Sequence, residues 1–238
     1  TDIEFLESKN GSVKIYKEPE EGHPYVVCND PAMGGEDYFA TQVFDNYTGE
    51  QVAVYHKNKI DADDAAYQMY CLAKTYNNAL ITGETNTTSY LLETCAKLGY
   101  TFIYQDQDIE ELGTKFFNKL GYKTKQNNRQ QMIDMFRMAF RDNPRIINDY
   151  ETICEMENFQ VVKHKNGTEK IEAAGGAHDD LVMAACGFYL CRNQQISVPI
   201  ESKKQDKKTY KSVYDYLDDK YLEKQRKTQQ RSVYQIWN

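Results

Sequence analysis

The sequence has no apolar run long enough to cross a membrane and no recognisable secretory leader. A membrane-spanning helix needs about 20 consecutive apolar residues. The first residues, Thr1 to Glu4, do not follow the basic-then-apolar pattern of a signal peptide. We therefore expect a cytoplasmic protein that is not secreted and has no transmembrane segment.

Closely spaced cysteine pairs are also absent. The six cysteines are Cys28, Cys71, Cys95, Cys154, Cys186 and Cys191. None of them belongs to a CxxC pair, the spacing typical of zinc sites and redox motifs. Most of them lie in apolar stretches, so we expect reduced thiols in the core rather than zinc ligands or disulfides.

The phosphate-binding loop GxxxxGK[ST] does not occur either, so we expect no P-loop motor in this chain. What the sequence does contain is typical of a soluble globular protein, with 40% apolar and 27% charged residues. Its 238 residues can bury a full core as one large or two small domains.

The net charge of −7 argues against a nucleic-acid partner, but the charge is unevenly distributed. Residues 113–145 contain eight basic and two acidic side chains, a local balance of +6. The basic residues are Lys115, Lys119, Lys123, Lys125, Arg129, Arg137, Arg141 and Arg145. This basic stripe is a candidate surface for phosphates, although arginines on a helix more often form a solvated face.

The periodicity of apolar residues predicts an α/β protein. We expect strands at 25–30, 38–46, 51–56, 79–84 and 101–104, helices near 61–76, 88–99, 125–142, 150–158 and 181–191, and a hairpin at 159–171 around an Asn-Gly turn. The first three strands form an antiparallel meander. We divide the chain into a lead-in strand or linker at 1–24, a domain at 25–195, and a polar, Tyr- and Lys-rich tail at 196–238 outside the core.

Acidic residues stand at the ends of several of these elements. Asp30 ends a buried strand just before Pro31, Glu84 ends another, and Asp179 and Asp180 open the last helix. In sheets flanked by helices, ligands bind at strand ends. Each acid also has a structural alternative: Asp30 as a turn residue, Glu84 as a partner of a lysine, and Asp179 as a helix cap.

The repetition of these acids is what the structural alternatives do not explain. Carboxylates gathered in one place raise each other's pKa and destabilise the fold unless a cation lies between them. Oxygen ligands without His or Cys favour Mg²⁺ or Mn²⁺. Two such ions can support hydrolysis of a phosphodiester. The acids therefore indicate nucleic-acid cleavage.

The order of elements and four motifs resemble the nuclease domain of tailed-phage terminase large subunits, within the ribonuclease H-like superfamily. The motifs are YVVCNDPAMGGEDY at 25–38, YNNALITGETN at 76–86, LGY at 98–100 and GGAHDDLVMA at 175–184. The resemblance spans roughly residues 10–192. It implies a ribonuclease H-like mixed sheet, with an antiparallel three-strand meander plus parallel strands, flanked by helices and carrying an inserted β-hairpin.

The resemblance also implies roles for individual residues. Asp30, Glu84 and Asp180 would be catalytic metal ligands, with Asp179 as a fourth ligand or helper and Asp37 as a secondary acid. Asn86 matches a Glu-x-Asn pattern of the family, although Thr87 to Ser89 replace the usual glycine-containing continuation. The hairpin would govern access of DNA. The residues that we expect to contact DNA are Lys115, Lys123, Lys125, Arg129, Lys163 and Lys165.

The implied function is a metal-dependent endonuclease that uses Mg²⁺ or Mn²⁺, two ions in all, and cuts double-stranded DNA with little sequence specificity. It would act in DNA packaging in the cytoplasm of an infected bacterium, with the portal, the small terminase subunit and an ATPase domain as partners. Two alternatives remain open. One is a ribonuclease H-like resolvase or transposase core, and the other is a non-catalytic module that docks on the portal.

Overall fold

The computed structural model describes residues 3, 5–8, 11–31, 38–106, 120–163, 169–175, 177–195 and 233–236. None of the helices in these ranges combines the length and the apolarity that a membrane crossing requires.

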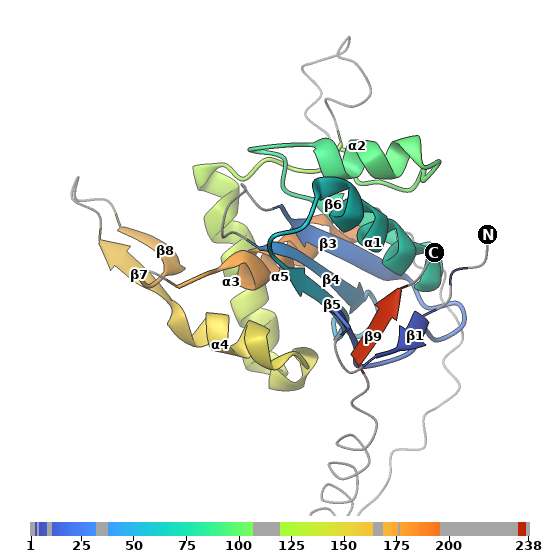
Figure 1. The fold of residues 1–238 in the computed structure, drawn as a ribbon. Coiled ribbons are helices and arrows are strands. Elements are labelled where there is room, and N and C mark those ends of the chain that lie inside the picture. Colours follow the sequence, from blue (N-terminus) through green and yellow to red (C-terminus); the bar gives the residue numbers. More distant parts are fainter. Residues whose placement is uncertain are drawn as a thin grey trace, which may run out of the picture.

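A mixed sheet forms the centre of the molecule (Figure 1). Its strands, in spatial order, are β1 (Phe5–Glu7), β9 (Val233–Ile236), β2 (Val13–Ile15), β5 (Gln51–Lys57), β4 (Phe39–Asp45), β3 (Tyr25–Asp30) and β6 (Leu80–Gly83). Strands β3, β4 and β5 form an antiparallel meander, and β6 pairs with β3 in parallel. The predicted mixed sheet is therefore confirmed.

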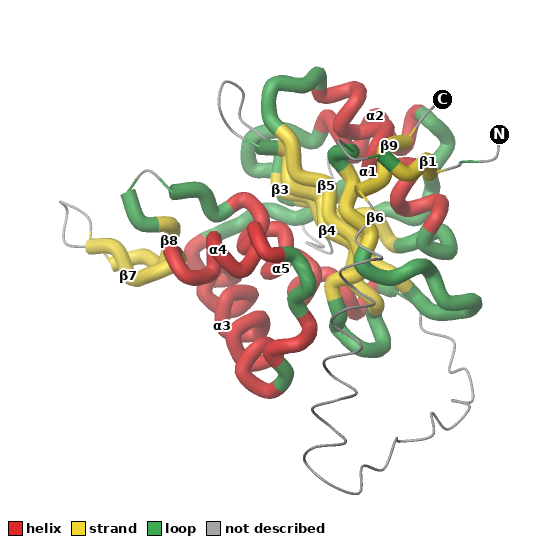
Figure 2. Tube along the Cα trace, turned by 60° about the horizontal axis from the view of Figure 1, so that its bottom comes forward, coloured by secondary structure: helices red, strands yellow, loops and turns green. Residues whose placement is uncertain are grey.

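Side chains of β3 alternate between two hydrophobic cores, one on each face of the sheet. Tyr25 and Val27 pack in the first core, under helices α1 (Ala62–Thr75) and α2 (Tyr90–Lys97). Val26 and Cys28 pack in the second, under α3 (Gln126–Asp142) and α5 (Asp180–Cys191). Figure 2 shows these two groups of helices on opposite sides of the strands. A strand buried on both faces explains the continuous apolar run at its start.

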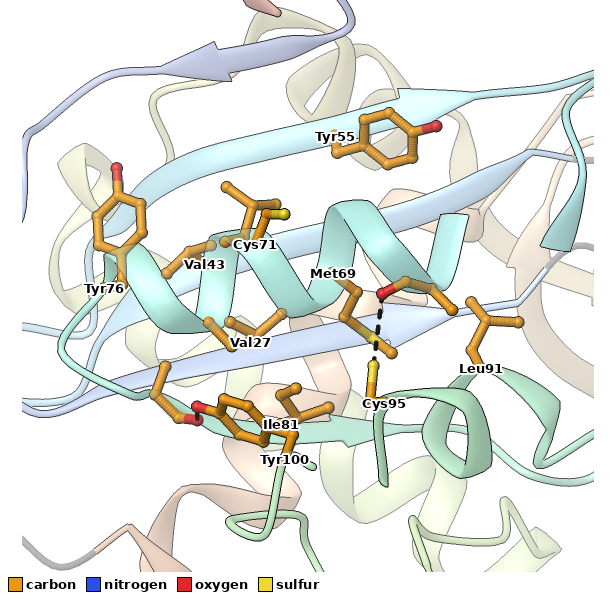
Figure 3. Packing of buried hydrophobic residues seen from close by; sticks show 14 of the residues in the cluster. Val27, Val43, Tyr55, Met69, Cys71, Tyr76, Ile81, Leu91, Cys95 and Tyr100 are labelled. Atoms are coloured by element: carbon orange, nitrogen blue, oxygen red, sulfur yellow. Dashed lines mark hydrogen bonds between the residues drawn. The ribbon is translucent and has the colours of Figure 1, made fainter. Parts of the chain in front are cut away.

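The first core contains two of the predicted buried thiols (Figure 3). Cys71 and Cys95 are buried among apolar side chains of α1, α2 and the sheet, and the Cys95 thiol donates a hydrogen bond to the carbonyl of Ala66 at 3.4 Å. All six cysteines of the chain are free, and five are buried while Cys154 is half-buried. Burial raises the pKa of the Cys95 thiol to about 12, so this thiol stays protonated and unreactive.

The second face also carries a short helix and the predicted hairpin. Helix α4 (Tyr150–Asn158) runs directly into β7 (Phe159–Lys163), which pairs with β8 (Glu169–Ala173) as a separate two-stranded sheet. In Figure 1 this hairpin projects away from the central sheet. Short 3-10 turns lie at Pro144–Ile146 and Arg192–Gln194.

One prediction about the sheet was wrong. The predicted strand at 101–104 is only a single bridge between Ile103 and Ile81, because the chain then pairs with Leu120 and Gly121 instead of continuing along β6. In the tail at 196–238 the structure describes only β9, which lies between β1 and β2 and pairs with both. The placement of the tail outside the core stays a prediction. The domain limits at 24/25 and 195/196 stay predictions.

Gly121 allows the chain to cross closely behind β6. Its φ is +71°, and a Cβ built there would lie 2.5 Å from the carbonyl oxygen of Gly83 and 2.6 Å from side-chain atoms of Leu92 and Thr85. Gly99 has a similar φ of +86°, but a Cβ there meets nothing within 4 Å. Comparing the same substitution at the two glycines therefore separates the cost of backbone strain from the cost of steric clash.

We expect Gly121→Ala to destabilise the fold more than Gly99→Ala. Both substitutions place a residue with a Cβ in the left-handed backbone region, which costs about 1–2 kcal/mol of folding free energy. Gly121→Ala adds the cost of overpacking, about 1–3 kcal/mol. Urea unfolding of the two variants measures the difference, and equal losses would contradict the close crossing at Gly121.

Candidate metal centre

Strand register places Asp30 and Glu84 next to each other. The parallel pairing of β3 with β6 runs from Val26–Leu80 to Asn29–Gly83, so both acids follow directly at the same end of the sheet. Because side chains alternate along a strand, Asp30 shares the face of Val26, which is the face covered by α5. The side chains of Asp30 and Glu84 lie close enough for Glu84 to raise the pKa of Asp30, both by its charge and as a hydrogen-bonding neighbour.

Helix α5 brings the second pair of acids to the same place. It packs on β3 and β4, with Asp180 as its first residue and Asp179 at the N-cap position. A small residue permits the close approach: a Cβ at Gly187 would lie 2.3 Å from the hydroxyl oxygen of Tyr122, which is bridged to Glu84. Any side chain at position 187 would therefore collide with Tyr122.

The electrostatics of Asp30 reflect this gathering of carboxylates. Burial raises the pKa of Asp30 well above its usual value. The negative charges of Glu84, Asp180 and Asp179 raise that pKa further, and so does the hydrogen bond to Glu84. The fold therefore brings the four predicted acids within electrostatic reach of one another. Their roles as ligands stay predictions.

The donor set fits a hard divalent cation. It offers carboxylate oxygens without thiols, and oxygen-only sets favour Mg²⁺ or Mn²⁺. Within the residues that the structure describes, no three acidic, histidine or cysteine side chains already stand in a coordinating arrangement.

Two basic side chains contact the acids on α5. The Arg129 Nη2 atom lies 3.5 Å from Asp179 Oδ2, and its Nη1 donates to the carbonyl of Ile171 in β8 at 2.6 Å. The Nδ1 atom of His178 lies 3.6 Å from Asp180 Oδ2. Arg129 was predicted to face DNA, but the structure also engages it between α3, the hairpin and Asp179.

Sequence analysis missed Glu155 in α4. Its Oε2 atom accepts hydrogen bonds from the backbone amides of Leu181, at 2.8 Å, and Val182, at 3.2 Å. Burial, together with the charges of Asp180 and Asp179, raises the pKa of Glu155 to about 8, although the two backbone hydrogen bonds oppose this shift. No sequence pattern distinguishes this residue from the other glutamates of α4.

Other predicted residues are described only in part. Asp37, Lys115 and Lys165 lie outside the described residues, and of Lys163 only the backbone, in β7, is described.

Lys123 and Lys125 are exposed and flank Thr124, just before α3. The amide of Asn86 donates to the Thr124 carbonyl at 2.7 Å, so the loop that follows Glu84 contacts the segment that carries these two lysines.

The fold matches solved structures of phage nucleases. The large terminase nuclease from thermophilic phage G20c aligns with a TM-score of 0.59 and 18% identity, covering 79% of this chain and 92% of that chain. A magnesium-bound structure of that nuclease aligns with a TM-score of 0.60 and 19% identity, and with the same coverage of both chains. The nuclease domain of the Thermus phage P74-26 large terminase aligns with a TM-score of 0.58 and 20% identity, covering 79% of this chain and 89% of that chain.

The G20c nuclease has also been solved with bound cobalt and with bound zinc. No family model and no curated protein matches the sequence. At this level of identity the comparison shows a shared fold, and it confirms the predicted ribonuclease H-like architecture.

Proposed function

We propose that this protein is the nuclease part of a phage large terminase and cuts double-stranded DNA in a reaction that depends on divalent metal ions. The observation that carries the proposal is the meeting of Asp30 and Glu84, at the ends of two parallel strands, with the acidic start of α5. Solved structures with a similar fold include large terminase nucleases, some with bound metal ions.

In this proposal Asp30, Glu84 and Asp180 hold two Mg²⁺ or Mn²⁺ ions, with Asp179 as a further ligand and Asp37 as a secondary one. Such ions supply charge stabilisation and a reactive water for hydrolysis of a phosphodiester. The chain's own contribution is to hold its carboxylates at fixed strand and helix ends. Arg129 keeps the Asp179 side chain in place from the outside.

DNA would approach along the basic stripe. Lys123 and Lys125 are exposed beside the loop that follows Glu84, and Lys115, Lys163 and Lys165 would extend the contact. If these lysines contact phosphates, which carry no sequence information, cleavage would show little sequence preference. The portal, the small terminase subunit and an ATPase domain are the proposed partners, in the cytoplasm of an infected host.

The proposal is tested by incubating the protein with supercoiled plasmid in Mn²⁺, in Mg²⁺ or with a chelator. We expect nicking and linearisation with either ion and none with the chelator. A four-way junction serves as a second substrate. Preference for that junction over linear duplex would favour a resolvase, and failure to cut any substrate in metal would favour a non-catalytic docking module.

Binding of duplex DNA should weaken steeply as salt rises. We expect the double variant Lys123→Gln/Lys125→Gln to flatten the plot of log K against log salt by about two units, since each phosphate contact contributes a slope of about one. The matched control is Lys74→Gln, an exposed lysine of α1 on the opposite face of the sheet. Fluorescence anisotropy with the chelator present measures both, and an unchanged slope for the double variant would exclude this DNA path.

A further inference from the structure

The start of α5 is capped by a side chain from another helix. Asp179 occupies the N-cap position, where an aspartate normally accepts a hydrogen bond from the second or third amide of the helix. Asp179 makes no such bond. The amides of Leu181 and Val182 donate instead to Glu155 of α4, and the Asp179 carboxylate faces Arg129.

The same turn is held from the sheet as well. Gln42, buried in β4, donates to the carbonyl of Leu181 at 2.7 Å. Gln51 of β5 fixes this amide by donating to the Gln42 side-chain oxygen at 2.7 Å, and it also contacts the hydroxyl of Thr152 in α4 at 3.1 Å. Both backbone groups of Leu181, the residue after Asp180, are therefore fixed by side chains from outside the helix.

We propose that Glu155 is a positioning residue of the metal centre, because it takes over the capping of α5 and so keeps the Asp179 carboxylate out of the cap, beside Arg129 and next to Asp180. This inference rests on the proposed function. Without an acceptor at Glu155, the two amides would be left unsatisfied in a half-buried place. Asp179 occupies the N-cap position, whose side chain normally accepts from these amides, and it would turn back to cap its own helix.

Two conservative variants separate the effect of side-chain length from the effect of side-chain charge. Glu155→Gln keeps the length and an acceptor oxygen but loses the carboxylate, whereas Glu155→Asp keeps the carboxylate and shortens the side chain by one methylene. Glu157→Gln is the control, since Glu157 is an exposed glutamate of the same helix. The measurements are Mn²⁺ affinity by calorimetry, and hydrogen exchange of the Leu181 and Val182 amides without metal.

We expect E155D to lose about tenfold or more in Mn²⁺ affinity, in line with the loss of groups that orient metal ligands, and to exchange both amides faster. E155Q and E157Q should remain close to wild type in both measurements. If E155D does not fold, E155Q decides alone, because retained affinity supports positioning and lost affinity refutes it.

Two results would overturn the inference while the proposed function stands. In one, E155D binds Mn²⁺ like the wild type, so that the cap is dispensable. In the other, E155Q loses as much affinity as E155D, so that Glu155 acts through its charge as a ligand. Failure of the wild-type protein itself to bind Mn²⁺ would overturn the proposed function, and the inference with it.

Discussion

Asp30→Asn should reduce plasmid cleavage in Mn²⁺ by more than about a hundredfold. Loss of a group that merely orients a metal ligand costs about 10–100-fold in affinity or activity, and a direct ligand should cost more. Asparagine keeps the size of the side chain but lacks the charge that a divalent cation requires. The rate of loss of supercoiled plasmid measures the effect.

The control for this variant is Asp142→Asn. Asp142 is an exposed aspartate at the end of α3, and its carboxylate lies 3.5 Å from Arg141. Because it is far in sequence from the acidic strand ends and open to solvent, its variant should cut like the wild type. Retained cleavage by Asp30→Asn would remove Asp30 from the metal centre, whatever the behaviour of the control.

Without metal, the same substitution should stabilise the protein. The folded protein raises the pKa of Asp30 well above its usual value, so the folded state binds this proton more tightly than the unfolded chain does. The contribution of Asp30 to stability is therefore full below the unfolded pKa, near 4, and is lost as pH rises through the folded pKa. Asparagine does not titrate and escapes this loss.

We thus expect metal-free Asp30→Asn to melt above the wild type at pH 8, with a difference that shrinks toward pH 4. For a chain of this size, each kcal/mol gained raises Tm by about 2–4 °C. Added Mn²⁺ should raise the Tm of the wild type and leave that of the variant nearly unchanged. A variant that melts below the wild type at pH 8 would show that the Asp30 charge is already compensated within the protein.

The meeting of Asp30 and Glu84 could be predicted from the sequence because it depends on local rules. Each acid ends a short apolar run, and parallel neighbouring strands bring their carboxyl ends to one edge of the sheet. The acidic start of α5 follows from the apolar helix after Asp180. These features depend on the periodicity of apolar residues and on where strands and helices begin and end, both of which can be recognised in the sequence.

The roles of Glu155 and Arg129 could not be predicted, because they depend on how helices pack. Glu155 is one of several glutamates in α4, and only the packing of α4 on α5 selects it as a cap. Arg129 looked like part of a solvated face, and its contact with Ile171 requires the hairpin to fold back beside α3. The pairing of β9 is equally non-local, since it joins the two ends of the chain.

Anomalous diffraction from crystals soaked in Mn²⁺ tests most directly whether the acids form one metal centre. We predict at least one strong peak within ligand distance, about 2.0–2.2 Å, of carboxylate oxygens from both Asp30 and Glu84, with Asp180 on the same ion or on a second. Peaks confined to other parts of the surface would contradict the account.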